Sequence, residues 1–168
     1  RLAKKGLSSS SLKNQMIWFQ LLPIFFAGLS FGIFSLLLER IVWEVPVFFF
    51  AQSVLAFTLL ELVNYLEHYG MERKKLSNGG YEKVTPIHSW NASQLVSNFL
   101  LFQLQRHSDH HAYAYKRYQV LDHHDQSPQL PAGYSAMIIL ACFPPLWFAV
   151  MNPRLEKWKK VQLAESVQ

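Results

Sequence analysis

A stretch of 22 residues without a single charged side chain, Ile17 to Leu38, is the strongest constraint that this sequence places on its fold. About 20 apolar residues are what a helix needs to cross the hydrocarbon core of a bilayer. Pro23, Gly28 and Gly32 lie within the run, and they are better tolerated in a membrane helix than in a soluble one. The alternative, a buried helix of a soluble protein, would have to hide all 22 residues. The run therefore predicts a transmembrane helix.

A second apolar run, from Val45 to Leu60, continues in a helical pattern to about Tyr69. We expect transmembrane helices at about 17–38 and 45–66, joined by a short turn. The turn carries only one basic residue, Arg40, whereas both outer ends are basic, with Lys4, Lys5 and Lys13 before and Arg73, Lys74, Lys75 and Lys83 after. Lys and Arg favour the cytoplasmic side, so both ends of this hairpin are expected on the cytoplasmic side of the membrane.

Composition narrows the class of function. Charged residues make up 16% of the chain, against about 25% in an average soluble domain. The net charge is +5, but the basic residues form no arm or stripe, and we expect no nucleic-acid partner. A single cysteine, Cys142, leaves neither a disulfide framework nor a CxxC metal site. Any metal ion must be held by histidines and carboxylates.

Residues 1–168 together are predicted to form one partial domain, with the fold of an all-α integral membrane helical bundle. Residues 67–133 form an expected cytoplasmic metal-site region, in which 94–115 has few helix breakers and is predicted to be one helix. The last apolar segment, 134–151, is interrupted by Pro144–Pro145 and is interpreted as a kinked, re-entrant or interfacial element. A basic cytoplasmic tail follows it.

Three histidines occur within five positions of that expected helix, at His107, His110 and His111. On a helix the spacing i, i+3, i+4 places them on one face, with Cβ atoms about 5–6 Å apart. Imidazole is the commonest protein ligand of transition metals. Asp109 would point elsewhere and accept a hydrogen bond from an imidazole of another element. The other interpretation is a solvated polar turn. Three histidines within five positions at a membrane boundary are unusual for such a turn, so the pattern favours a metal site.

A second polar pair, Glu67 and His68, lies where the second apolar helix is expected to leave the bilayer. Such groups are costly at this depth unless they are paired or bind a metal, although they could also reach the headgroup region. Both histidine sites fall on the predicted cytoplasmic side, which supports one shared metal centre. His88 is interpreted as a loop residue that contacts a metal ligand, stays at the surface or binds the metal, in that order, and His123 and His124 as loop or surface residues.

Four strings together resemble the membrane-bound non-haem di-iron alkane 1-monooxygenase family. They are NYLEHYG (64–70), LQRHSDHHA (104–112), RYQVLDHHDQSPQLPAGY (117–134) and FPPLW (143–147). The wider group of histidine-box enzymes, including membrane desaturases and xylene monooxygenase, shares the HxxHH spacing but not the whole set of strings.

The resemblance implies terminal hydroxylation of medium-chain n-alkanes by O2 at a centre of two non-haem iron ions. It implies electrons from rubredoxin, itself reduced by a rubredoxin reductase, and substrate entry from membrane lipid. Carried over to this chain, it makes His68, His107, His110 and His111 iron ligands. Glu67 and Asp109 would then contact and orient these ligands.

The sequence departs from the family in one respect. The family's first two histidine boxes, of the HExxHK and EHxxGHH kind, are not found in it, and the first residue is Arg1. We therefore expect a C-terminal part of the enzyme, inactive alone and weak in iron binding. Two alternatives stay open: a related oxygenase or desaturase acting on an alkyl aromatic or a fatty acyl chain, and a non-catalytic membrane protein that binds metal or docks a partner.

Overall fold

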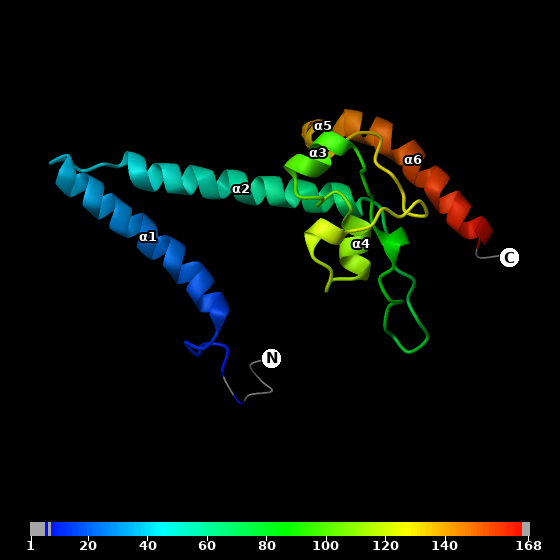
Figure 1. Ribbon diagram of the computed structural model, residues 1–168, viewed down its shortest axis with the longest axis horizontal. Helices are drawn as coiled ribbons and strands as arrows, with labels where there is room; N and C mark the ends of the chain where they lie inside the picture. Colours follow the sequence, from blue (N-terminus) through cyan, green and yellow to red (C-terminus); the bar gives the residue numbers. More distant parts are fainter. Residues whose placement is uncertain (1–5, 7, 166–168) are drawn as a thin grey trace. The chain divides into compact units, whose positions relative to one another are not determined.

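The computed structural model describes residue 6 and residues 8–165 (Figure 1). Every named element in this part of the chain is an α-helix or a 3-10 turn. Within these residues, extended pairing is limited to two isolated bridges, Lys75–Tyr81 and Asn91–Gln129. In chain order the elements are α1 (Gln15–Leu37), α2 (Glu44–His68), the 3-10 turn η2 (Pro86–His88), α3 (Leu95–Leu100), α4 (His107–Ala112), the 3-10 turn η3 (Tyr118–Val120), α5 (Tyr134–Ala141) and α6 (Pro144–Glu165). The all-α prediction is confirmed.

Helices α1 and α2 are both long and apolar enough to cross a membrane. The side chain of Asn14 caps α1 by accepting a hydrogen bond from the amide of Met16, and Pro23 lies inside the helix. Most of the large apolar side chains of both helices are exposed, which is the arrangement that suits contact with lipid. Helix α2 extends to His68, so Glu67 and His68 occupy its last turn.

The chain divides into two compact units, residues 1–57 and residues 58–168. In the second unit, the short helices α3, α4 and α5 gather with α6 at the C-terminal end of α2 (Figure 1). Their shared core is made of apolar side chains that are at most 4% exposed: Leu66, Trp90, Ala92, Leu130, Tyr134, Met137, Trp147 and Met151. This core fixes the last turn of α2 against the loops that follow.

The single helix predicted over residues 94–115 is wrong. Helix α3 ends at Leu100, the chain turns through Phe102 and Gln103 at φ 51° and 59°, and α4 begins only at His107. The break is stabilised by Gln105, which is fully buried and hydrogen-bonded to the side chain of Ser97 and the backbone amide of Tyr134. Tertiary hydrogen bonds thus override a local helical tendency.

The interruption expected at Pro144–Pro145 is displaced slightly, because both prolines occupy the first turn of α6 and the break lies just before them. Proline suits this position, where its missing N–H would have no helical partner. Helix α6 then runs on to Glu165, through Pro153. The second half of the apolar segment, 144–151, and the expected tail therefore share one helix, whereas the first half forms α5.

Gly70 turns the chain away from the end of α2 with φ +68°. A Cβ atom at this position would overlap Cδ2 of Leu155 on α6. Only glycine combines this conformation with so close an approach, and the contact brings α6 against the end of α2.

Candidate metal centre

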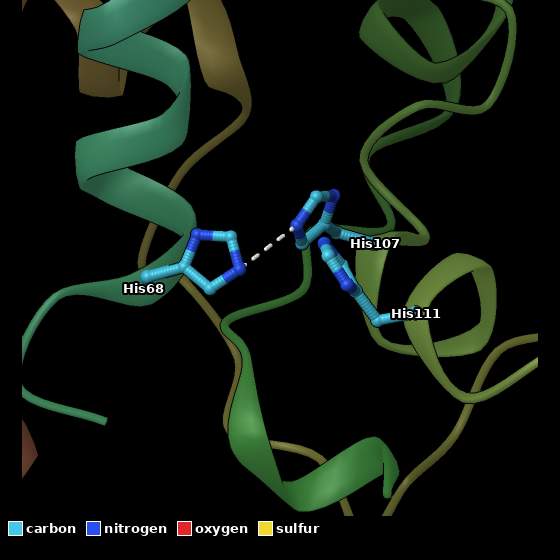
Figure 2. Close-up of side chains that lie close together, drawn as sticks. All are labelled: His68, His107 and His111. Carbon is cyan, nitrogen blue, oxygen red and sulfur yellow. Dashed lines mark hydrogen bonds between the residues drawn. The ribbon is translucent and has the colours of Figure 1, made fainter. Parts of the chain in front are cut away.

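Three imidazoles converge at one point of the second unit: His68 from the last turn of α2, and His107 and His111 from α4 (Figure 2). One ligand nitrogen from each lies within 4.8 Å of the others. The ring centroids are 4.9 Å apart for His68–His107, 5.1 Å for His68–His111 and 4.3 Å for His107–His111. The predicted meeting of the two histidine motifs is thus present in the fold.

Acceptors lie beside the Nδ1 atoms of two of these rings. Nδ1 of His68 is 2.9 Å from the carbonyl oxygen of Asn64, one turn earlier in α2. Nδ1 of His107 is 3.1 Å from Oε1 of Glu67 but is not aligned for a hydrogen bond to it. Protons on both Nδ1 atoms leave both Nε2 atoms as lone-pair donors, and these two Nε2 atoms face each other at 3.4 Å.

The separation of 3.4 Å suits either a shared proton or a shared metal ion. Burial, reinforced by the neighbouring imidazoles of His111, His68 and His110, lowers the pKa of His107 to about 2. Burial likewise lowers the pKa of His111. Both shifts disfavour the proton. Two imidazole nitrogens bound at about 2.1 Å to one ion lie roughly 3.0–3.4 Å apart, so the donor set fits a transition-metal ion.

Glu67, predicted to orient a ligand, is 3% exposed. Its Oε1 accepts a hydrogen bond of 2.7 Å from the hydroxyl of Tyr134 and faces Nδ1 of His107. Its backbone carbonyl accepts from the amide of Trp90. The side chain therefore points into the protein, toward the α4 imidazole, rather than toward the headgroup region.

Asp109, the other predicted orienting residue, is fully buried and touches a different imidazole. Its carboxylate accepts from Nε2 of His124 at 2.7 Å, from the amide of Asp122 at 2.9 Å, and from Nζ of Lys116 at 3.1 and 3.0 Å. Burial acts to raise the pKa of Asp109, but the hydrogen bonds from His124, Asp122 and Lys116 outweigh it and hold the pKa below its ordinary value. Asp109 thus ties α4 to the loop 116–124.

A buried hydrogen-bond network that sequence reasoning missed holds the start of α4. Asn91 donates from Nδ2 to the hydroxyl of Ser108 at 2.6 Å and accepts from the amide of Ser108 at 2.9 Å. Ser127 donates to the same hydroxyl at 3.0 Å. All three residues are at most 2% exposed. Polar residues in the strings IHSWNA (87–92) and DQSPQL (125–130) were the available signal, but their pairing depends on the fold.

The other histidines occupy distinct positions. His110 is exposed, with its ring 6.1 Å from that of His107 and 5.7 Å from that of His111, and it lies outside the trio that shares one point. His88 is buried against Glu82, with 3.0 Å between Nε2 and Oε1. His123 contacts Ser93 and Asp125.

A cavity of about 360 Å³ adjoins the imidazoles, and its lining includes His68, His111, His88, Glu72, Arg73, Met71 and Val84. Two of the three clustered rings therefore face an accessible space. Small molecules and protons can reach this side of the cluster without crossing the apolar core.

Comparison with known proteins shows to which family the chain belongs. The model of the fatty acid desaturase family matches residues 1–141. The chain belongs to that family. Together with α1 and α2, this membership identifies a membrane protein with a helical-bundle fold. It also implies an iron cofactor, which the imidazole trio suits.

Two alkane monooxygenases are closely similar to nearly the whole chain, and a third relative is similar to part of it. Alkane 1-monooxygenase 2 of Pseudomonas aeruginosa is 53% identical over 94% of this chain, and alkane 1-monooxygenase 2 of Alcanivorax borkumensis is 50% identical over 96% of it. The xylene/toluene monooxygenase hydroxylase component of Pseudomonas putida is 29% identical over 64% of it. The resemblance drawn from the four strings is confirmed. The chain spans about 40% of the length of the alkane monooxygenases.

Proposed function

We propose that the protein hydroxylates the terminal carbon of medium-chain n-alkanes at a histidine-ligated iron centre. In this reaction one oxygen atom of O2 enters a C–H bond, and the other leaves as water after uptake of two electrons and two protons. The observation that carries the proposal is the convergence of His68, His107 and His111, from two motifs 39 residues apart, on one point. The similarity to alkane 1-monooxygenases supports the choice of reaction.

The ligands in this proposal are His68, His107 and His111, with His110 on the same helix as a further one. Iron would supply the activation of O2. Glu67 would orient the His107 imidazole directly, whereas Asp109 would act on the ligands only by holding α4 to the loop 116–124. Two iron ions need more ligands than four imidazoles, so a di-iron centre in this proposal draws further ligands from outside this chain.

The electron donor proposed is rubredoxin, with rubredoxin reductase behind it. We place the site on the cytoplasmic side of a bacterial inner membrane, because basic residues flank both outer ends of the predicted hairpin whereas Arg40 alone stands between the helices. An alkane has no polar handle, and its binding rests on apolar burial, worth about 0.8 kcal/mol per CH2. Exposed apolar faces on α1 and α2 are consistent with arrival from lipid.

The test is product analysis. Membranes containing the whole enzyme of which this chain is expected to be a part, supplied with rubredoxin, its reductase and NADH, are incubated with octane, and 1-octanol is measured by gas chromatography. His111→Ala should abolish product and reduce bound iron. His123→Ala, the same change at a histidine bonded to Ser93 and Asp125, should retain both. Iron binding without any oxidised product would instead favour a non-catalytic metal protein.

A second candidate substrate is an alkyl aromatic, favoured by the similarity to the xylene/toluene hydroxylase component. Parallel incubations with octane, p-xylene and a fatty acid separate the possibilities. A benzylic alcohol as the main product would replace the alkane proposal, and an unsaturated acid would point to a desaturase.

A further inference from the structure

The hydroxyl of Tyr134 lies at the back of the metal site. Tyr134 begins α5 and is fully buried. Its hydroxyl donates to Oε1 of Glu67 at 2.7 Å, and the same oxygen lies 3.1 Å from Nδ1 of His107. One carboxylate oxygen is therefore shared by a phenol on one side and a metal-facing imidazole on the other.

Glu67 needs this partner. A carboxylate that is 3% exposed is costly to bury unless hydrogen bonds replace water. A phenol O–H aimed at Oε1 supplies one such bond and restricts rotation of the carboxylate. Imidazoles that bind metals generally donate their second N–H to an acceptor of this kind, which fixes the ring and its tautomer. An oriented carboxylate is thus a condition for an oriented His107.

The backbone of Tyr134 is tied to the same segment that carries His107. Its amide donates to Oε1 of Gln105 at 2.8 Å, and Gln105 is itself fully buried. Gln105 lies two residues before His107 in the chain. Tyr134 is consequently attached at both ends. Its amide is bonded through Gln105 to the segment leading into α4, and its hydroxyl is bonded through Glu67 to the last turn of α2.

We propose that Tyr134 is a positioning residue of the metal centre, which holds the Glu67 carboxylate where it orients the His107 imidazole. This rests on the proposed metal site of His68, His107 and His111. It assigns to Tyr134 an effect on metal binding that is transmitted entirely through Glu67.

The test is a double-mutant cycle of Tyr134→Phe and Glu67→Leu, which removes both carboxylate oxygens, in the whole enzyme in detergent micelles. Iron(II) affinity is measured anaerobically by competition with a chelator, and the ligand-field bands of bound cobalt(II) report the coordination. Tyr134→Phe keeps the ring and removes only the hydroxyl. It should weaken iron binding by more than twofold, but by no more than the loss of Glu67 itself, a direct partner of a ligand, for which about 10- to 100-fold is usual, and it should shift the cobalt bands.

Transmission through Glu67 predicts that Tyr134→Phe has no further effect in the Glu67→Leu background, where no oxygen is left to position. Tyr69→Phe is the matched control, because it removes a hydroxyl bonded at 2.6 Å to Asn152 on α6 and should leave metal affinity unchanged. Thermal unfolding of the metal-free variants checks that all of them fold. Affinity of Tyr134→Phe within twofold of the unsubstituted protein, or effects that multiply in the double variant, would overturn the proposal.

The proposed hydroxylation and the role of Tyr134 can fail separately. Iron binding that depends on Tyr134, in a protein that makes no oxidised product, supports the positioning role and refutes the hydroxylase. Product formation with Tyr134→Phe binding iron as tightly as the unsubstituted protein does the reverse.

Discussion

Replacing Asp109 by asparagine tests whether the buried carboxylate of this residue holds α4 to the loop 116–124. Asp109→Asn preserves the shape of the side chain and removes its charge. The carboxylate now accepts from His124, from the amide of Asp122 and twice from Lys116. An amide offers one acceptor oxygen and turns two N–H donors toward groups that are themselves donors.

The expected cost follows from this mismatch. A hydrogen bond to a charged group contributes about 1.5–3 kcal/mol, and an unsatisfied buried partner adds its own penalty. Lys116 keeps a second partner, because its Nζ is 2.7 Å from Oδ2 of Asp122, so only part of the network fails. We expect Asp109→Asn to lower the free energy of unfolding by about 2–4 kcal/mol.

Guanidinium titration in detergent micelles, followed by tryptophan fluorescence, measures this change. Trp90 and Trp147 are at most 2% exposed and report on the same unit. Asp122→Asn is the control, since that carboxylate is 68% exposed and exposed ion pairs contribute little. Equal midpoints for Asp109→Asn and Asp122→Asn would refute the reasoning.

Three further outcomes are expected. Gly70→Ala should destabilise the protein more than Gly79→Ala, because both change a residue of positive φ but only the first meets another side chain, and a thermal scan of the two variants decides it; equal shifts would contradict the contact. Asn91→Ala leaves buried polar partners unsatisfied and should cost about 2 kcal/mol in the same guanidinium titration, whereas a loss under half of that would show a weak network. The pKa of His107 is lowered to about 2 and that of His111 is also lowered, so both imidazoles stay neutral at a pH below their ordinary pKa of about 6.5. Iron affinity should therefore fall less steeply from pH 7 to pH 5.5 than it would with three freely titrating imidazoles. Chelator competition across that range measures this slope.

Local geometry explains what sequence reasoning could predict. The two long apolar helices follow from the uncharged runs, because spanning length depends only on rise per residue. The common face of His107, His110 and His111 follows from helical periodicity, and the short α4 is enough to express it. The HSDHH spacing therefore predicted a metal site although the long helix assumed to carry it was wrong.

Contacts between distant segments were decided only by the tertiary structure. Asp109 meets His124 because the loop after η3 folds back on α4, and no periodicity links them. Tyr134 reaches Glu67 across 67 positions because Gln105 breaks the expected helix and anchors α5. Local pattern specifies which residues share a helix face. Which acceptor stands behind each imidazole depends on packing between elements, and in this chain that packing sets the orientation of the candidate ligands.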